Sequence, residues 1–139
     1  MGPKPIDTIL LVDDDPIICH LNTKMIEFIG YEGIVAAVSS GETALDYLRK
    51  TRPTHNSKSR SILILLDLNM PNMNGLEFLQ QLAILEAINK EKLYVAILSS
   101  DPHHVEEDLK DSLAGCLEKP LCENQMKKLL RSLAKVESI

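Results

Sequence analysis

Residues Ile62-Leu63-Ile64-Leu65-Leu66-Asp67 form a run of five apolar side chains that ends at a carboxylate. Three further runs also end at a polar side chain: Ile9–Val12 before Asp13, Val95–Leu98 before Ser99, and Gly115–Glu118 before Lys119. Short apolar runs separated by helix-length amphipathic segments are typical of buried parallel strands. In an open α/β sheet, ligands bind at the carboxyl ends of the strands, so we expect the functional side chains to gather along one edge.

The length and composition of the chain fit one globular domain. Its 139 residues suffice for a single hydrophobic core, and 45% hydrophobic with 25% charged residues is an average globular composition. Lys and Arg number 15 against 20 Asp and Glu, which gives a net charge of −5 and disfavours a nucleic-acid partner. Aromatic residues make up 4% of the chain, too few to expect a stacked nucleobase or flavin ring.

The cysteine pattern indicates a reducing compartment, and the apolar segments are too short to cross a membrane. Cys19, Cys116 and Cys122 are odd in number and form no Cys-x-x-Cys pair, so we expect neither a disulfide framework nor a zinc site. No apolar stretch approaches the roughly 20 residues that cross a bilayer, and no hydrophobic signal region follows Met1. We therefore expect a cytoplasmic protein without membrane contact.

Strand-like and helix-like segments alternate along the chain. The expected strands are 9–12, 34–38, 62–66, 93–98 and 116–118. Asp15-Pro16 predicts the start of a helix after the first strand, Gly30 predicts its end, and Ser39–Glu42 has the pattern of a capping box. The polar segment Thr51–Arg60 is expected to be an unusually long loop. The alternation predicts five βα units, which is an α/β fold with a parallel sheet.

Helical spacing predicts which side chains of each helix face the sheet. They are Ile18, Leu21, Met25 and Phe28 in the first helix, Leu45 and Leu48 in the second, Leu76, Leu79, Leu82 and Ala83 in the third, Val105, Leu109 and Leu113 in the fourth, and Met126, Leu129, Leu130 and Leu133 in the last. Each helix is thus expected to present an apolar stripe to a buried sheet.

Three carboxylates follow the first and third strands: Asp13, Asp14 and Asp67. Neighbouring strands lie about 4.8 Å apart, so these carboxylates crowd together and repel one another if the two strands are neighbours. A divalent cation relieves that repulsion, and an all-oxygen set suits Mg²⁺, which keeps waters for a phosphate. Asp67 is the best placed to act as a nucleophile and form an aspartyl phosphate. Asp15 is interpreted as a helix cap only.

Ser99 and Lys119 are the expected donors for phosphoryl transfer. Negative charge grows on the phosphoryl oxygens, so a positioned cation and hydroxyl matter more than a proton shuttle. Ser99 is expected beside Asp67, and Lys119 follows a strand roughly 10 Å away, a gap that its long stem mostly closes. Pro120 bars Lys119 from helical geometry and gives the Lys119–Pro120 bond access to the cis form.

The motifs at these strand ends are, in order, Ile9-Leu10-Leu11-Val12-Asp13-Asp14-Asp15, Leu65-Leu66-Asp67-Leu68-Asn69-Met70-Pro71, Leu98-Ser99-Ser100 and Lys119-Pro120. They make the chain similar to the receiver domain of two-component response regulators over essentially its whole length. The resemblance implies a flavodoxin-like (βα)5 fold, doubly wound, with a parallel five-stranded sheet in the order 2-1-3-4-5. It also implies phosphorylation of Asp67, with Mg²⁺ held by Asp14, Asp67 and the backbone carbonyl of Asn69, and Asp13 assisting through water.

The resemblance gives roles to further residues. Ser99 takes the place of the family's switch hydroxyl and Lys119 that of its lysine, while Asn69 and Asp101 occupy the positions that tune hydrolysis of the acyl phosphate. Cys116 departs from the pattern, because many members carry a Tyr or Phe there whose rotation reports phosphorylation. The switch is therefore expected to be read through backbone shifts of the loop after the fourth strand, or to lack the aromatic gate.

The resemblance also implies the partners. The donor is expected to be a sensor histidine kinase or a histidine phosphotransfer protein that contacts the first helix and the loops around Asp67. The last predicted helix uses up the sequence, so we expect a single stand-alone receiver over 1–139, structured over about 6–137, that passes its signal to a downstream protein. It is expected to be a monomer or weak dimer, and no enzyme beyond its own phosphorylation and dephosphorylation. The basic residues of the last helix form either a docking patch or a complement to the helix dipole: Lys127, Lys128, Arg131 and Lys135.

Three other functions compete with this one. A haloacid-dehalogenase-like phosphatase also uses a strand-end Asp with Mg²⁺ and a lysine, but it requires a second Asp where this chain has Asn69. A flavodoxin would need a hydroxyl-rich phosphate loop after the first strand. A degenerate receiver acting as a scaffold is disfavoured, because the set of site residues is intact.

Overall fold

A computed structural model describes residues 5–53, 60–70, 73–86, 88–101 and 113–137. Its elements are β1 (Thr8–Val12), α1 (Pro16–Phe28), β2 (Ile34–Val38), α2 (Gly41–Thr51), β3 (Ile62–Asp67), α3 (Gly75–Ile84), β4 (Leu93–Ser99), β5 (Gly115–Glu118) and α5 (Glu123–Glu137). Every predicted strand agrees with these bounds to within one residue. The predicted fourth helix, with Val105 and Leu109, lies outside the described residues.

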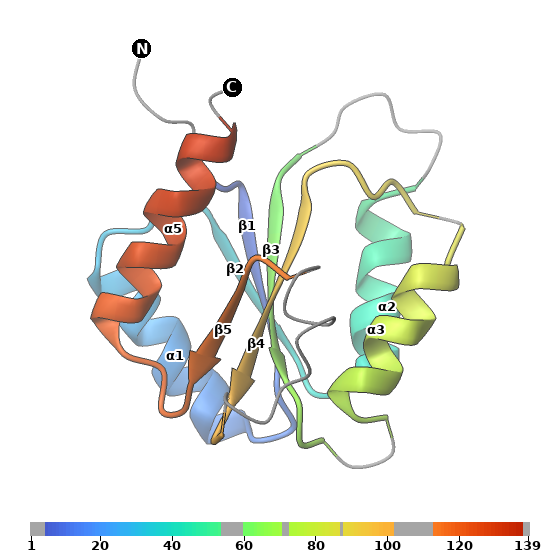
Figure 1. The fold of residues 1–139 in the computed structure, drawn as a ribbon, viewed down its shortest axis with the longest axis horizontal. Helices are drawn as coiled ribbons and strands as arrows, with labels where there is room; N and C mark the ends of the chain where they lie inside the picture. The colour runs from blue at the N-terminus through green and yellow to red at the C-terminus, as the bar shows by residue number, and fades with distance from the viewer. Residues whose placement is uncertain (1–4, 54–59, 71–72, 87, 102–112, 138–139) are drawn as a thin grey trace.

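The strands form one parallel sheet in the order β2-β1-β3-β4-β5. Figure 1 shows α1 and α5 on one face of this sheet and α2 and α3 on the other. This confirms the predicted doubly wound, flavodoxin-like arrangement and its strand order. β1 and β3 pair in register from Thr8 with Ile62 to Val12 with Leu66, so the residues after both strands leave the sheet at the same edge.

The core has two apolar layers, one on each face of the sheet. β3 is buried along its whole length. Its alternate side chains serve both layers, because Ile64 packs with Phe78 of α3 while Leu63 packs with Met126 of α5. This two-sided burial explains why the strands read as continuous apolar runs rather than as alternating patterns.

The predicted inward face of α1 is wrong for most of its residues. Ile18, Leu21 and Phe28 are exposed to 38%, 56% and 79%, whereas Cys19 and Ile26 are buried. Apolar side chains follow two stripes on this helix, and periodicity alone does not tell which one packs. The stripe with the smaller side chain of Cys19 packs against β1 and β3.

The inward face of α3 is also shifted. Leu76 is 48% exposed and Ala83 is exposed, while Leu82 and the unpredicted Phe78 are buried. Phe78 buries more apolar area than either outward residue, which favours this rotation of the helix. The predicted faces of α2 and α5 are confirmed by burial of Leu45, Leu48, Met126, Leu129 and Leu133. No helix within the described ranges combines the length and the apolar character that crossing a bilayer requires.

The capping box of α2 lies one residue later than predicted. Ser40, not Ser39, is the N-cap, and its Oγ accepts from the amide of Thr43 at 3.1 Å. Thr43 Oγ1 in turn accepts from the amide of Ser40 at 3.1 Å. The side chain of Thr43 therefore fills the role predicted for Glu42, which still places a negative charge in the first helical turn.

Arg52 joins the end of α2 to the segment before β4. The residue is 6% exposed, and its guanidinium donates to the carbonyls of Asn89 (3.0 Å), Arg60 (2.6 Å) and Glu91. Pro53 also forms an isolated antiparallel bridge with Ile88. Thr51 was predicted to begin the loop but is the last residue of α2. The two ends of the connection are thus held in place, while residues 54–59 lie outside the described residues.

Candidate functional site

Three carboxylates meet at the carboxyl edge of the sheet. Asp13 follows β1 and Asp67 ends β3, and the register of these two strands sets them side by side. Oxygen atoms of Asp13, Asp14 and Asp67 lie within 4.8 Å of one another. Asp13 and Asp67 are 7% and 3% exposed, while Asp14 is exposed to solvent. The edge therefore concentrates negative charge where two of the groups have little access to water.

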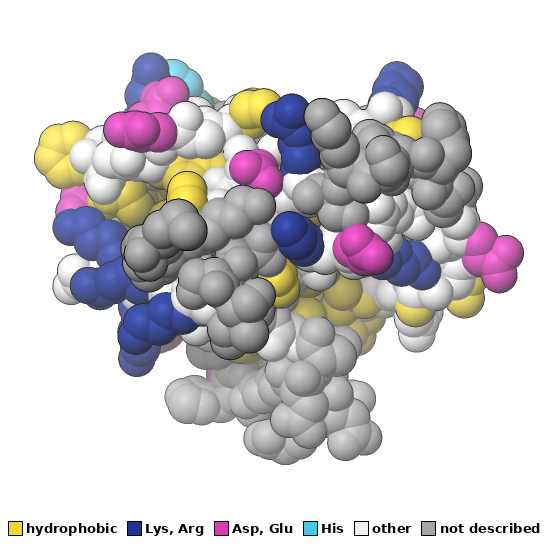
Figure 2. All heavy atoms as spheres, turned by 90° about the horizontal axis from the view of Figure 1, so that it is seen from above, with side chains coloured by type: hydrophobic (Ala, Val, Ile, Leu, Met, Phe, Trp, Pro, Cys, Tyr) yellow, Lys and Arg dark blue, Asp and Glu magenta, His cyan; other side chains and the backbone are white. Residues whose placement is uncertain are grey.

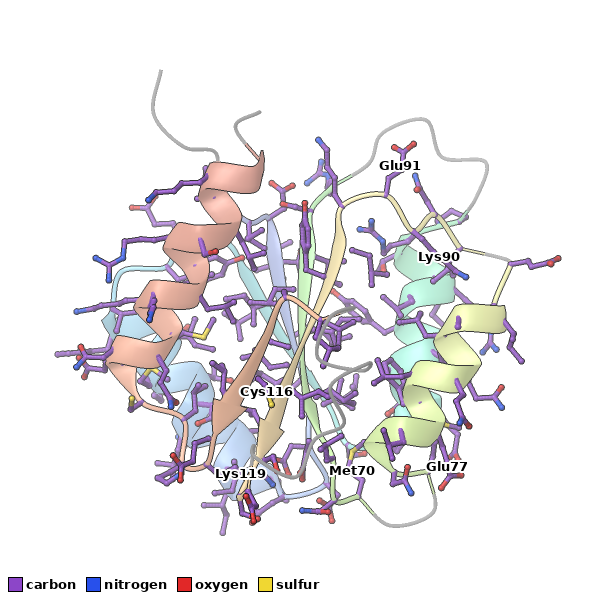
Figure 3. The ribbon with its side chains drawn as sticks, in the orientation of Figure 1. Met70, Glu77, Lys90, Glu91, Cys116 and Lys119 are labelled. Carbon is purple, nitrogen blue, oxygen red and sulfur yellow. The ribbon has the colours of Figure 1, made fainter. Side chains whose placement is uncertain are left out.

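Asp67 is held by two donors on one oxygen. Lys119 Nζ donates to Asp67 Oδ1 at 2.5 Å, and the amide of Asn69 donates to the same oxygen at 3.0 Å. The amide of Lys119 donates to the carbonyl of Ser99 at 2.9 Å, and the Lys119–Pro120 bond is cis. Figure 3 shows Lys119 at the same edge of the sheet as Met70, which follows β3. A cation from β5 thus reaches a carboxylate on β3.

Asp13 is held in a different way. Its Oδ1 accepts from the amide of Asp15 at 2.9 Å, and its carbonyl accepts from Cys19 Sγ at 3.5 Å. Burial raises the pKa of Asp13, and the charges of Asp67 and Asp14 raise it further, against the opposing effects of the Asp15 amide and Lys119. An added cation would favour the ionised form of Asp13.

A cavity of about 740 Å³ opens onto this cluster. Its polar lining combines the four carboxylates Asp13, Asp14, Asp15 and Asp67 with Asn22, Asn69 and Lys119. Its apolar lining consists of Ile18, Leu21, Met25, Leu98, Pro120 and Leu121. The outward stripe of α1 therefore forms one wall of the acidic cavity.

Other predicted site residues lie near this cavity without lining it. Ser99 ends β4 opposite Glu118 of β5, is 6% exposed, and accepts from the amide of Asp101 at 3.1 Å through its Oγ. Cys116 pairs with Ile97 further inside the sheet and is half-buried. Neither Ser99, Asp101 nor Cys116 is part of the cavity lining.

Asp15 acts as the predicted helix cap. Its Oδ1 accepts from the amides of Ile17 at 2.9 Å and Ile18 at 3.4 Å. The side chain is exposed at the rim of the cavity.

Gly75 is a site residue that the sequence reasoning did not single out. Its amide donates to the carbonyl of Leu68 at 3.1 Å. A Cβ at this position would lie 2.9 Å from Leu68 Cα and 3.2 Å from the carbonyl oxygen of Asp67. The close approach of α3 to the acceptor strand therefore requires glycine. The signal available in the sequence was the position of this glycine at the end of the turn after Asp67.

The donor set suits a small, hard cation. The three clustered carboxylates offer only oxygen ligands, and the cavity has room for water molecules beside them. Mg²⁺ prefers one or two protein carboxylates and retains several waters. The residues of this edge therefore fit Mg²⁺.

Residues 9–131 match the response regulator receiver domain family. The nitrate/nitrite response regulator protein NarL of Escherichia coli is 32% identical over 132 residues, which cover 95% of this chain and 56% of NarL. A two component response regulator from Cytophaga hutchinsonii has a crystal structure with a TM-score of 0.74 and 29% identity, covering 94% of this chain and 98% of that one. The receiver domain of sensor histidine kinase PA1611 from Pseudomonas aeruginosa, solved with a magnesium ion coordinated in its active site cleft, has a TM-score of 0.71 at 21% identity and covers 93% of this chain and 98% of its own.

The chain spans only part of the length of several curated relatives. It covers 20% and 32% of two further response regulators. The matched region nevertheless includes every described strand except the first residue of β1. The strand order and the acidic edge agree with that match. The chain therefore belongs to the response regulator receiver domain family of two-component systems.

Proposed function

We propose that this protein accepts a phosphoryl group on Asp67 from a sensor histidine kinase or a histidine phosphotransfer protein. The supporting observation is the pairing of a buried Asp67 with Lys119 at 2.5 Å beside two further carboxylates. In the proposed step a carboxylate oxygen of Asp67 forms a bond to phosphorus while the bond from phosphorus to the donor nitrogen breaks, and the donor imidazole keeps that electron pair. Lys119 then offsets negative charge on the phosphoryl oxygens.

The proposed cofactor is Mg²⁺, held by Asp14, Asp67 and the backbone carbonyl of Asn69, with Asp13 assisting through water. When bound, it neutralises charge shared between the carboxylates and the incoming phosphoryl group. The donor set and the cavity support this assignment, as does the magnesium ion in the cleft of the PA1611 receiver.

Further residues are proposed to act after transfer. Ser99, at the end of the strand beside Asp67, would donate its hydroxyl to a phosphoryl oxygen and so report the modified state. Asn69 and Asp101 are proposed to set the rate of acyl phosphate hydrolysis. Cys116 stands where a rotating aromatic ring is common, so the signal is proposed to pass through the backbone after β4.

The donor is proposed to dock on the apolar wall of the acidic cavity. Ile18 and Leu21 of α1 are exposed, and Pro120 and Leu121 also line the cavity. An apolar rim around a charged centre lets a donor protein exclude water as its histidine approaches Asp67.

Receiver domains are signalling modules, and we propose that this one acts in the cytoplasm. It would work as a monomer or weak dimer through a downstream protein target. The phosphatase alternative is not favoured, since Asn69 stands where that class requires a second Asp.

Incubation with acetyl phosphate and Mg²⁺, followed by intact mass measurement, tests the proposal. We expect one added phosphoryl group, its loss when Mg²⁺ is chelated, and none on Asp67→Asn. Asp15→Asn is the matched control, because Asp15 lies in the same cavity but serves as a helix cap. Unchanged labelling of Asp67→Asn would overturn the assignment.

A further inference from the structure

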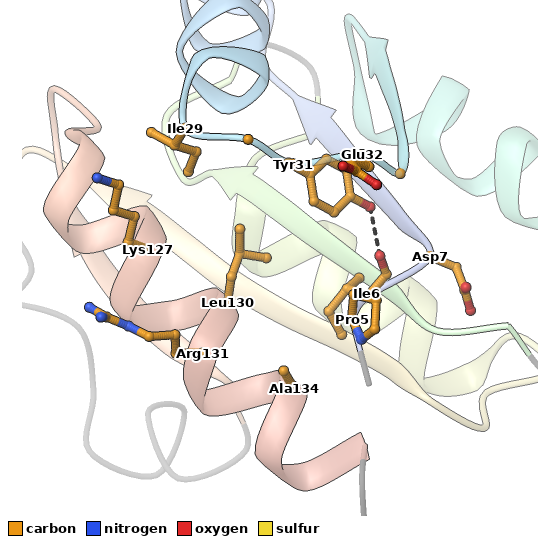
Figure 4. A pocket seen from close by; sticks show the side chains of 12 residues that line it. Pro5, Ile6, Asp7, Ile29, Tyr31, Glu32, Lys127, Leu130, Arg131 and Ala134 are labelled. Carbon is orange, nitrogen blue, oxygen red and sulfur yellow. Dashed lines mark hydrogen bonds between the residues drawn. The ribbon is translucent and has the colours of Figure 1, made fainter. Parts of the chain in front are cut away.

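A second groove lies at the opposite edge of the sheet from the acidic cluster. It has a volume of about 600 Å³ and runs between α5 and the connection from α1 to β2. Its floor is mainly apolar, with Ile6 before β1, Ile29 after α1, and Leu130 and Ala134 of α5. Figure 4 shows Leu130 projecting from α5 toward the segment that carries Ile29 and Tyr31. The groove is therefore concave, apolar at its base and separate from the proposed phosphorylation site.

The α5 side of this groove is strongly basic. Between Asn124 and Val136 the helix has four Lys or Arg residues and no acidic one, on a chain with a net charge of −5. Figure 2, which looks onto the end of the molecule where this groove lies, shows Lys and Arg side chains gathered on the side of α5. Lys127 and Arg131 line the groove and are exposed, and neither has an ion-pair partner in the part of the chain that the structure describes.

The opposite side of the groove carries the two acidic residues of the lining. Asp7 lines it, but its Oδ2 accepts from the amide of Ser61 at 2.8 Å and from Ser61 Oγ at 3.1 Å. Glu32 is the other acidic residue of the lining. The basic residues of the lining are thus confined to the α5 wall, and that wall favours an occupant whose carboxylates face α5.

We propose that this groove binds an acidic amphipathic helix of a partner protein. Lys127 and Arg131 are four residues apart, so they lie on one face of α5 with a rise of about 6 Å between them. Leu130 and Ala134 repeat that spacing in an adjacent apolar row. A helix packed beside α5 can match both rows with carboxylates four residues apart and aliphatic side chains directed at the floor.

A second copy of the chain is a poorer occupant. Pairing through this face would bring two basic α5 helices close together, and like charges across an interface oppose association. Charge complementarity therefore selects an acidic partner.

Fluorescence anisotropy tests this proposal. The probe is a labelled peptide of about 18 residues, because shorter helices are marginal in water. It consists of Leu, Ala and Glu, with Glu at every fourth position. The full chain is expected to bind this peptide and to ignore the same peptide with Lys in place of each Glu. Lys127→Glu combined with Arg131→Glu should weaken binding by about tenfold or more. Lys128→Glu is the matched control, because Lys128 is exposed on the same helix but does not line the groove. Its effect should be less than about threefold.

Amide chemical shifts locate the contact independently. The acidic peptide should shift resonances of 29–33 and 127–134 and leave Asp67 unchanged, whether or not the chain accepts phosphate. Shifts centred on Asp67, an equal loss with Lys128→Glu, or no binding at about 1 mM peptide would each overturn the proposal. Dimerisation without peptide, seen in sedimentation equilibrium and abolished by Lys127→Glu, would also overturn it. Binding to phosphatidylserine vesicles that displaces the peptide would overturn it as well.

Discussion

Replacing Lys119 with Met should destabilise the protein far more than replacing Asp67 with Asn. Lys119 Nζ lies 2.5 Å from Asp67 Oδ1, and the side chains are 31% and 4% exposed. At an effective dielectric constant of about 20, a pair at this distance attracts by about 6 to 7 kcal/mol. The oxygens of Asp13 and Asp14 lie within 4.8 Å of those of Asp67. On the same scale each repels Asp67 by at least about 3 kcal/mol.

The two substitutions remove different parts of this balance. Asp67→Asn removes the attraction and both repulsions together, so the free energy of unfolding should change by less than about 1 kcal/mol. Lys119→Met keeps the aliphatic stem but leaves three carboxylates without their cation. The pair is partly exposed, so we expect a loss of about 2 to 3 kcal/mol, between the values typical of exposed and of broken buried pairs.

Urea unfolding at pH 7 with Mg²⁺ chelated measures both effects. The double variant supplies the control, because removing Asp67 should recover most of the stability that Lys119→Met loses. Equal destabilisation by the two single substitutions would refute the reasoning, since it would mean that the attraction alone governs this edge. A loss below about 0.5 kcal/mol for Lys119→Met would refute it as well.

Other predictions concern stabilisation by Mg²⁺, the contributions of Asp13 and Arg52 to stability, and the loss of stability at alkaline pH. Mg²⁺ at about a hundredfold above its dissociation constant should raise the free energy of unfolding by about 2.7 kcal/mol. Asp13 has a raised pKa, so its ionisation opposes folding at neutral pH. Without Mg²⁺, Asp13→Asn should therefore be more stable than the unsubstituted chain. Added Mg²⁺ should stabilise this variant less than the unsubstituted chain, and thermal unfolding measures both differences. Arg52→Lys should lower the free energy of unfolding in urea by about 3 kcal/mol, because one ammonium cannot replace donors to three separate carbonyls. The control Arg49→Lys, on the exposed side of α2, should lower it by less than about 0.5 kcal/mol. Burial, with a smaller effect of a nearby carboxylate, raises the pKa of Tyr31, whose hydroxyl donates to the Ile6 carbonyl at 2.9 Å. The folded protein favours the neutral hydroxyl of Tyr31, so this group adds to the free energy of unfolding below about pH 10 and loses that contribution as the pH rises further. Tyr31→Phe should therefore reduce the fall in the free energy of unfolding between about pH 10 and 12.

The strands and the acidic edge could be predicted because they depend on local features. A buried parallel strand is a short apolar run, and β3 shows this with six buried residues in succession. The residue that ends such a run must lie at the carboxyl edge, which is why Asp67 and Lys119 could be expected together despite a sequence separation of 52. The order of the strands came from the family resemblance, since periodicity carries no information on which strands pair.

The rotations of α1 and α3 could not be predicted, because packing and not spacing decides between competing apolar stripes. Phe28 continues the helical repeat of α1 and is nevertheless 79% exposed. Arg52 was missed for a related reason: a single arginine at a loop reads as a surface residue, and its carbonyl partners at Asn89 and Glu91 lie 37 and 39 positions away. The second groove was missed because its walls come together only through the fold.

Locating the phosphoryl group within the acidic cluster tests the central claim most directly. Borohydride reduces an acyl phosphate of aspartate to homoserine, and peptide mass spectrometry then identifies the reduced position. After treatment with acetyl phosphate and Mg²⁺, the account predicts homoserine at position 67 and at neither Asp13 nor Asp14. Homoserine at either of those two positions, with Asp67 intact, would contradict it.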